Sequence, residues 1–214
     1  SRSWPRGPRQ DERGTRVTFG PAETRAMVRA LELARTPGVP TGPNPRVGCV
    51  IADGETVIAQ GWHVRAGGPH AEADALAKAG GAARGATAYV TLEPCCHTGR
   101  TPPCTAGLIA AGIRRVVYGA SDPNPRVNGG GEKALRAAGV EVSGGLLAAE
   151  SERLNAGFML RMRRGWPLDT GEPLFELNSG RLMMPASNMK ILTLAAAADA
   201  LGWDYVFTTT LETS

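Results

Sequence analysis

The stretch Thr91-Leu-Glu-Pro-Cys95-Cys-His-Thr-Gly-Arg100-Thr-Pro-Pro-Cys104, together with His70-Ala-Glu72 upstream of it, decides how the rest of the chain is interpreted. One histidine, two cysteines and a glutamate in this order are typical of a hydrolytic zinc site. Zinc binds imidazole and thiolate ligands tetrahedrally, and a catalytic site leaves the fourth position to water. The pattern therefore predicts that His70, Cys95 and Cys104 hold Zn²⁺.

Glu72 lies two residues beyond His70 and is expected to carry protons rather than to bind the metal. Zinc held by three protein ligands lowers the pKa of its water to about 7, so that hydroxide is available at neutral pH. Glu72 could then pass the proton of that water to a leaving amine. This set of groups predicts hydrolytic removal of an amino group.

Each part of the pattern also has a simpler interpretation. A lone His-x-Glu is more often a surface histidine beside a solvated glutamate, and the presence of Pro94-Cys95 is what favours a metal site. A disulfide between Cys95 and Cys104 is the other alternative. No secretion signal is recognisable in the sequence, so we expect a cytoplasmic protein, in which such a disulfide is rare.

The two remaining cysteines are not assigned to the metal. Cys49 lies in the apolar run of residues 47–51 and is interpreted as a small buried hydrophobic residue. Cys96 neighbours a predicted ligand, but its side chain should point elsewhere if Cys95 faces the metal. We leave Cys96 without a role.

Length and composition set the outer limits. A chain of 214 residues with 42% hydrophobic content can form one good-sized domain and an appendage. The longest apolar stretch, residues 191–201, contains Asp199 and is shorter than the about 20 residues of a membrane span. The net charge of +4 suits an anionic ligand, whereas an aromatic content of 5% gives no reason to expect nucleic acid.

Hydrophobic patterns predict helices and strands in alternation. The expected helices are residues 21–35, 69–79, 104–111 and 132–138, and the expected strands are residues 47–51, 56–61, 87–92, 114–119 and 140–142. Such alternation favours an α/β sandwich around a central sheet. Residues 1–20 are rich in Arg, Pro and Gly and are interpreted as a disordered basic tail.

Residues 23–167 closely resemble the deaminase domain of the bifunctional riboflavin-biosynthesis deaminase/reductase, of the cytidine-deaminase-like zinc superfamily. The matching segments are Pro43-Asn-Pro-Arg-Val-Gly-Cys-Val50, Gly61-Trp-His63, Gly68-Pro-His-Ala-Glu72, Tyr89-Val-Thr-Leu-Glu-Pro-Cys95, His97-Thr-Gly-Arg-Thr-Pro-Pro-Cys104, Asp122-Pro-Asn-Pro125, Leu154-Asn155 and Gly157-Phe158. The resemblance implies a three-layer α/β/α fold with a central mixed sheet, a deaminase domain over residues 21–167, and one closing amphipathic helix over residues 150–164.

The resemblance also implies an activity: hydrolytic deamination of diaminohydroxyphosphoribosylaminopyrimidine, a phosphoribosylated pyrimidine, to the aminouracil intermediate of riboflavin biosynthesis. The family positions that line the substrate pocket correspond to Asn44, His63, His97, Arg100, Asp122 and Asn124. Arginine suits a phosphate because its donors can bind bidentately, although many family members have Lys at this position. From the residues alone, Asp122-Pro-Asn-Pro125 could be only a turn, and Asn44 between prolines could only shape a loop.

Two other functions stay open at this point. The chain could deaminate another base, a nucleoside or a tRNA, although the two cysteines of those enzymes usually form Cys-x-x-Cys and here eight residues separate Cys95 from Cys104. It could also be a zinc-stabilised interaction module without turnover, against which the presence of Glu72 argues. Association into a homo-oligomer is compatible with either alternative.

Residues 168–214 depart from the family pattern. No Gly-x-Gly-x-x-Gly dinucleotide loop is found there, so reductase activity is not expected. The segment instead resembles the start of a penicillin-binding D-alanyl-D-alanine carboxypeptidase, with Ser187 and Lys190 in a Ser-x-x-Lys motif, although Ser187 could equally be a helix N-cap. The companion Ser-x-Asn and Lys-Thr-Gly motifs do not follow, so we expect a non-functional fragment, joined by natural fusion or by artefact.

Overall fold

The structure is a computed structural model that describes residues 18–36, 44–98 and 101–164. Its helices are α1 (Pro21–Ala34), α2 (Ala71–Ala79), α3 (Cys104–Ala110), α4 (Gly130–Ala137), α5 (Ala148–Leu154) and α6 (Ala156–Arg164), with a short 3₁₀ helix η1 (Gly80–Ala83). Its strands are β1 (Gly48–Asp53), β2 (Thr56–Trp62), β3 (Thr87–Leu92), β4 (Arg115–Ala120) and β5 (Glu141–Gly144). The helices and strands predicted for residues 21–142 are all present, with bounds that differ by a few residues.

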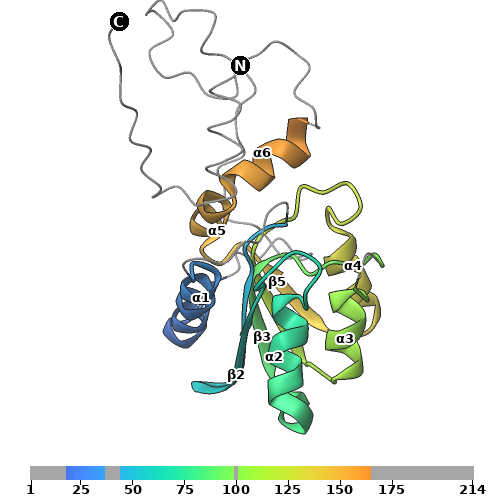
Figure 1. Cartoon of the computed structure of the whole chain (residues 1–214). Coiled ribbons are helices and arrows are strands. Elements are labelled where there is room, and N and C mark those ends of the chain that lie inside the picture. The colour runs from blue at the N-terminus through green and yellow to red at the C-terminus, as the bar shows by residue number, and fades with distance from the viewer. Residues whose placement is uncertain (1–17, 37–43, 99–100, 165–214) are drawn as a thin grey trace, which may run out of the picture.

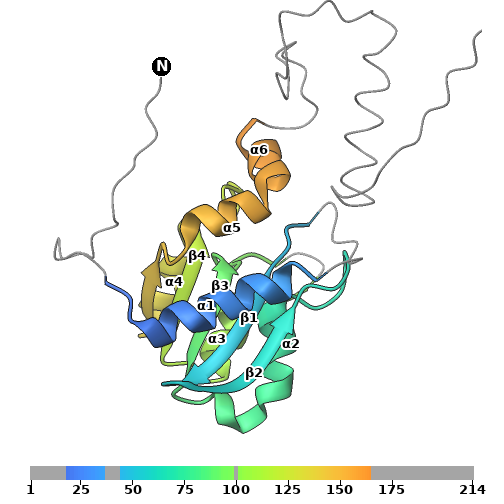
Figure 2. The same ribbon diagram turned by 90° about the vertical axis from the view of Figure 1, so that its left-hand side faces the viewer.

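The five strands form one mixed sheet in the order β2-β1-β3-β4-β5. Strand β1 is antiparallel to both β2 and β3, whereas β4 is parallel to β3 and to β5. Helices α1 and α5 cover one face of the sheet, and α2, α3 and α4 cover the other (Figure 1). Figure 2 shows α1 lying across the strands of its face. The predicted three-layer α/β/α fold with a mixed sheet is therefore confirmed.

The core is divided between the two faces because successive side chains of a strand point in opposite directions. In β1, Cys49 and Ile51 pack toward α2, α3 and α4. Val50 and Ala52 pack on the opposite face, together with Met27 of α1. Cys49 is wholly buried and forms no disulfide, as expected for a cysteine that acts as a small hydrophobic residue.

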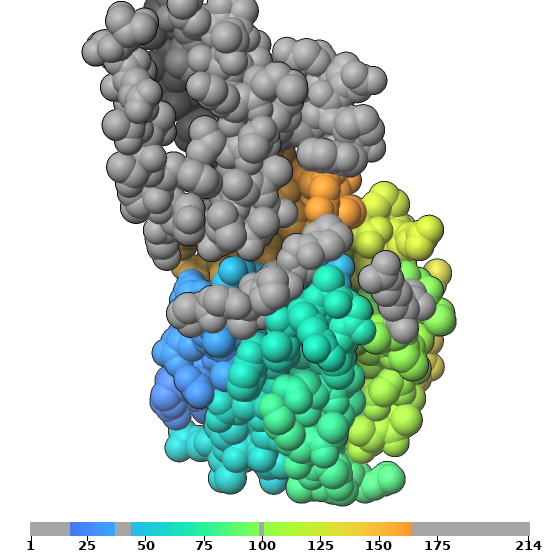
Figure 3. Space-filling view, in the orientation of Figure 1, coloured from blue at the N-terminus to red at the C-terminus, as the bar shows by residue number. Residues whose placement is uncertain are grey.

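Helix α2 and strand β2 are held together by close backbone packing. A Cβ atom on Gly61 of β2 would lie 2.4 Å from the carbonyl oxygen of Ala71 and 2.5 Å from the backbone nitrogen of Ala75. Only glycine at this position lets α2 lie against β2 so closely. In the space-filling view of Figure 3, α2 and α3 form neighbouring parts of the same face.

The expected single helix over residues 150–164 is wrong, because the chain forms two helices that meet at a corner. Helix α5 ends at Leu154, and Asn155 has φ −113° and ψ 26° before α6 begins. The side chain of Asn155 forms hydrogen bonds with the backbone of Arg46, 109 residues away. This tertiary contact accompanies a break that the apolar pattern of the segment does not reveal.

A second correction concerns the start of α2. The helix expected over residues 69–79 would include both His70 and Glu72 in its first turn, but His70 is the N-cap residue, with extended dihedral angles of φ −71° and ψ 161°. Its side chain is therefore directed differently from those within the helix. No helix in the described part of the chain is long and apolar enough to cross a membrane.

Candidate active site

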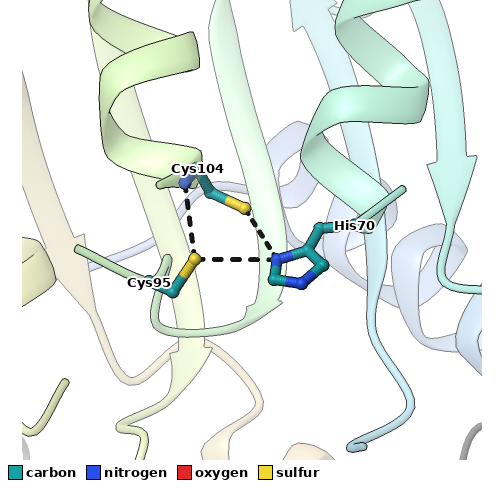
Figure 4. Close-up of side chains that lie close together, drawn as sticks. All are labelled: His70, Cys95 and Cys104. Carbon is teal, nitrogen blue, oxygen red and sulfur yellow. Dashed lines mark hydrogen bonds between the residues drawn. The ribbon is translucent and has the colours of Figure 1, made fainter. Parts of the chain in front are cut away.

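Three predicted ligands meet at one edge of the sheet. His70 precedes α2, Cys95 follows β3, and Cys104 is the first residue of α3. One ligand atom from each lies within 4.8 Å of the other two, although the residues are 34 positions apart in sequence at most. Figure 4 shows the two thiols directed toward the imidazole ring.

The imidazole of His70 is held from both sides. Its Nδ1 atom is 3.1 Å from the sulfur of Cys104 and 3.6 Å from that of Cys95. Its Nε2 atom is 3.2 Å from the hydroxyl of Thr101. A partner on the far nitrogen sets the tautomer and the orientation of a metal-binding histidine, so Thr101 directs Nδ1 toward the thiols.

The pKa values of the two thiols are shifted in opposite directions. Hydrogen bonds with the Cys104 thiol and with His70 hold the pKa of Cys95 well below its usual value. The Cys95 thiolate and burial in turn raise the pKa of Cys104. The backbone N–H of Cys104, at the start of α3, also donates to the Cys95 sulfur at 3.4 Å, and an amide at a helix start stabilises a thiolate.

This donor set fits zinc. Zn–S bonds of about 2.3 Å and Zn–N bonds of about 2.0–2.1 Å in a tetrahedron place neighbouring ligand atoms about 3.5–3.8 Å apart. The separations of 3.1 and 3.6 Å between Nδ1 of His70 and the two sulfurs are close to this range. All four cysteines are free, and the Cys96 thiol points away to the carbonyl of Arg126 at 3.5 Å.

Glu72 is buried beside the thiols without belonging to the group of three. Its side chain is 4% exposed and lines the same cavity as His70 and Cys95. Burial raises the pKa of the Glu72 carboxyl, which a hydrogen bond with Cys104 partly opposes. A carboxyl at this place could exchange a proton with a ligand in the cavity.

The cavity above these residues has a volume of about 570 Å³, within the usual range for small-molecule sites. Five of the six predicted substrate residues line it, and Arg100 lies outside the residues that the structure describes. The five are Asn44, His63, His97, Asp122 and Asn124. The Nδ1 atom of His97 is buried and has no hydrogen-bond partner within the described ranges, so it is available to a ligand.

Two of these residues form a pair. The side-chain nitrogen of Asn44 is 3.2 Å from Nε2 of His63, and Nδ1 of His63 is 2.9 Å from the carbonyl oxygen of Pro69. A carbonyl oxygen only accepts, so Nδ1 carries the proton and Nε2 accepts from Asn44. Burial lowers the pKa of His63, in agreement with a neutral ring.

Asp122 and Asn124 line the cavity and also form hydrogen bonds within their own loop. The Asp122 carboxylate accepts the backbone N–H of Asn124 at 2.8 Å, and the side-chain oxygen of Asn124 accepts that of Arg126 at 3.1 Å. These are the turns that the sequence suggested as the simpler alternative. Burial raises the pKa of Asp122 to about 6, and the nearby charges of Glu93 and Cys95 add to this effect.

Sequence reasoning missed the role of Glu93 in the site's architecture. Its buried carboxylate accepts the backbone N–H groups of Gly129 at 3.1 Å, Gly131 at 3.1 Å and Glu132 at 3.3 Å. It therefore caps α4, whose own N-cap residue makes no side-chain hydrogen bond. This connects the segment of Cys95 to the end of the loop that carries Asp122.

A wall of the cavity was also missed. Phe158, Arg161 and Met162 of α6 line it, and Arg161 lies over the ring of Phe158 at 5.7 Å. Phe158 lies in the Gly157-Phe158 segment that matches the family, which was a signal, but the expectation of one continuous helix obscured it. Ser187 and Lys190 lie outside the described ranges, so the structure says nothing about that pair.

Two family models match the chain. Residues 22–120 match the cytidine and deoxycytidylate deaminase zinc-binding region, and residues 146–214 match the D-Ala-D-Ala carboxypeptidase 3 (S13) family. The first contains all three residues of the candidate metal group. The second overlaps α5 and α6, which pack against the sheet of the first.

Curated relatives extend the first match. The riboflavin biosynthesis protein RibD of Escherichia coli is 57% identical over 141 residues, which are 66% of this chain and 38% of that protein. The diaminohydroxyphosphoribosylaminopyrimidine deaminase of Buchnera aphidicola is 50% identical over 141 residues, 66% of this chain and 96% of that protein. The chain thus spans less than half of the Escherichia coli relative and nearly the whole of the Buchnera one.

A solved structure agrees with these matches. The RibD protein of Acinetobacter baumannii superimposes with a TM-score of 0.64 at 48% sequence identity, over 66% of this chain and 40% of that one. The resemblance noted from the motifs is therefore confirmed by sequence and by fold.

Proposed function

The chain belongs to the diaminohydroxyphosphoribosylaminopyrimidine deaminase family, and from this premise we propose that it hydrolytically deaminates that phosphoribosylated pyrimidine in riboflavin biosynthesis. The observation that carries the proposal is the convergence of His70, Cys95 and Cys104 within 4.8 Å beside the buried Glu72. The proposal is confined to deamination.

In this proposal Nδ1 of His70 and the sulfurs of Cys95 and Cys104 hold zinc. Zinc bound there supplies a Lewis acid that lowers the pKa of a water molecule to about 7. Glu72 takes up a proton from the attacking water and returns it to the departing amino group. Its burial supports this role, because exclusion of bulk water leaves the ligand as the partner in proton transfer.

Recognition of the pyrimidine falls to the polar groups around the cavity. Nδ1 of His97, which has no partner among the described residues, and the carboxamide oxygen of Asn44 can each meet a donor or acceptor on the ring or ribose. Asp122, whose pKa is raised by burial, can do so as well. We further assign the phosphate to Arg100 and to Arg161, because guanidinium groups bind phosphate bidentately and Arg161 lines the cavity.

Ammonia release tests the proposal. Purified zinc-loaded protein should release ammonia from diaminohydroxyphosphoribosylaminopyrimidine, less efficiently from its dephosphorylated analogue, and far less from cytidine. A preference for cytidine would favour a nucleoside deaminase. Release from none of the three, by protein that carries one zinc per chain, would contradict the proposed activity.

A further inference from the structure

We infer that Asn155 is a positioning residue of this site: its side-chain amide fastens the backbone at Arg46 and thereby holds the carboxamide of Asn44 against His63. The inference rests on the proposed function, because that function gives Asn44 its ligand. Asn155 itself does not line the cavity and is not among the predicted substrate residues.

The contact between Asn155 and Arg46, which we call the clamp, consists of two hydrogen bonds. The side-chain oxygen of Asn155 accepts the backbone N–H of Arg46 at 2.8 Å, and its side-chain nitrogen donates to the carbonyl oxygen of Arg46 at 2.9 Å. Both backbone groups of one residue are thus satisfied by one amide, as a neighbouring strand would satisfy them. Asn155 is 4% exposed, so water does not readily replace either bond. Aspartate has the same shape but lacks the donor.

The loop before β1 needs such a partner. Pairing of β1 with β2 begins at Gly48, so Arg46 lies outside the ladder. Val47 is held by the backbone N–H of His63, which donates to its carbonyl at 3.0 Å. The clamp at Arg46 supplies the equivalent anchorage one residue earlier in the chain, where no strand is available.

Pro45 connects the hydrogen-bonded backbone of Arg46 to Asn44 and limits how far Asn44 can move. A proline has a fixed φ and restricts the residue before it, so the segment from Asn44 to Arg46 is stiff. The carboxamide nitrogen of Asn44 donates to Nε2 of His63, since the other ring nitrogen is occupied by Pro69. Within the described ranges the carboxamide oxygen of Asn44 has no hydrogen-bond partner, so it can accept a hydrogen bond from a ligand.

The corner at Asn155 also places α6, from which Phe158, Arg161 and Met162 line the cavity. Met159 packs with Leu92 and Ala120 in the core at the end of the sheet. The main-chain N–H of Met159 donates to the carbonyl of Asn155 at 2.8 Å, so the first turn of α6 is closed without the side chain of Asn155. Loss of the clamp should therefore loosen the loop of Asn44 more than the fold.

Steady-state kinetics on the full-length zinc-loaded protein test the inference. Asn155→Ala and the equal-volume Asn155→Asp should each raise KM for the phosphoribosylated pyrimidine about tenfold, the usual effect of one lost buried hydrogen bond, while kcat and zinc content change little. Leu135→Ala is the control for general destabilisation, because Leu135 is wholly buried in the core and does not line the cavity; it should lower Tm and leave KM unchanged.

A double-mutant cycle separates positioning from a merely structural role. If Asn155 acts through Asn44, then Asn155→Ala should have little further effect on KM in an Asn44→Ala background. Effects that multiply in the double variant would overturn the inference.

Hydrogen exchange without substrate gives a readout that does not depend on activity. In Asn155→Ala the Arg46 amide should exchange about ten- to hundredfold faster, and the side-chain amide signal of Asn44 should shift, while the Val50 amide within β1 stays protected. Unchanged Arg46 exchange would reject the clamp. Faster exchange and a shifted Asn44 signal in a protein that releases no ammonia would uphold the clamp and reject the proposed substrate instead.

Discussion

Cys104 and Cys96 are chemically alike but differ in what surrounds them. The Cys104 sulfur lies 3.1 Å from Nδ1 of His70, whereas the Cys96 thiol donates to the carbonyl of Arg126. At the scale of single residues the candidate site therefore depends on where each side chain points as well as on residue type. Thr101 and Glu93 make the same point, since the hydrogen bond of Thr101 to His70 and those of Glu93 to the start of α4 are identified by no motif.

The difference between the two cysteines leads to a prediction about metal binding. Cys104→Ser should lose zinc and turnover together, because a serine hydroxyl is a far weaker zinc ligand than a thiolate. Cys96→Ser is the matched control and should keep one zinc per chain. Metal content by mass spectrometry under native conditions measures both. Full zinc retention in Cys104→Ser would remove this cysteine from the ligand set.

Glu72 allows zinc binding and proton transfer to be separated. Glu72→Gln should retain zinc but lose turnover by about 10²–10⁴-fold, the usual contribution of a general acid and base. The exchange preserves the shape of the side chain and removes only its ability to carry a proton at neutral pH. Zinc content and ammonia release are measured on the same sample. Normal turnover in the zinc-replete variant would reject the role of Glu72.

Asp122 makes stability depend on pH. Its pKa is raised by burial from 3.8 to about 6 in the folded protein, so the folded state binds more protons than the unfolded state between these values. The stability associated with the protonated carboxyl is present below the unfolded pKa and is lost as pH rises through about 6. In zinc-free protein, the free energy of unfolding of Asp122→Asn should therefore exceed that of the original protein by an amount that grows as pH rises. The growth between pH 4 and pH 7.5 should be up to about 3 kcal/mol.

Urea denaturation at the two pH values measures this difference. The backbone hydrogen bond to Asn124 is kept, because the asparagine oxygen still accepts. A difference that does not change with pH would mean that Asp122 is solvated in the folded protein. Substrate contact would explain why so costly a carboxylate is present.

At the scale of elements, the position of α2 relative to β2 determines where His70 and Glu72 lie. This position depends on Gly61, because a Cβ atom there would approach the backbone of Ala71 to 2.4 Å. The helix start that carries the candidate site is thus placed by a strand residue nine positions before His70.

We therefore expect Gly61→Ala to displace α2 and to lower both thermal stability and zinc affinity, with an overpacking cost of about 1–3 kcal/mol. Gly81→Ala is the matched control, because a Cβ atom at Gly81 would meet nothing within 4 Å. Differential scanning calorimetry and competition with a zinc chelator measure the two effects. Equal behaviour of the two variants would show that α2 adapts without loss.

At the scale of the whole molecule, the deaminase fold extends beyond the region of its family model. Leu146, Ser151 and Met159 are buried against the sheet, although the carboxypeptidase model matches from residue 146 onward. The structural unit therefore includes α5 and α6, and residues 146–164 belong with the deaminase whatever the origin of residues 168–214.

Two truncations test this boundary. A chain that ends at residue 167 should keep its zinc and its ammonia release, because all the cavity-lining residues found in the described part of the chain are retained. A chain that ends at residue 145 should fail to fold cooperatively, because it exposes the core under α5 and α6. Circular dichroism melting distinguishes the two outcomes. Loss of activity in the longer chain would mean that residues 168–214 support the deaminase.

Local sequence patterns were sufficient to predict much of the secondary structure and the types of the metal-binding residues. Strand Thr87–Leu92 was predicted with its observed bounds, because a short apolar run between turn residues is the signature of a buried strand. The ligand types and the order of His70, Cys95 and Cys104 were likewise readable, because zinc chemistry restricts which side chains can serve.

Tertiary packing decided what spacing along one segment cannot report. The break at Asn155, its bonds to Arg46 and the cavity wall of α6 depend on segments 109 residues apart being brought together. Periodicity records which side of an element is buried, but not which distant backbone group an individual amide will meet. The sequence by itself determined the residues available for the chemistry and the elements that carry them. The fold decided which of those side chains face one another, because hydrogen bonds are directional and require contact.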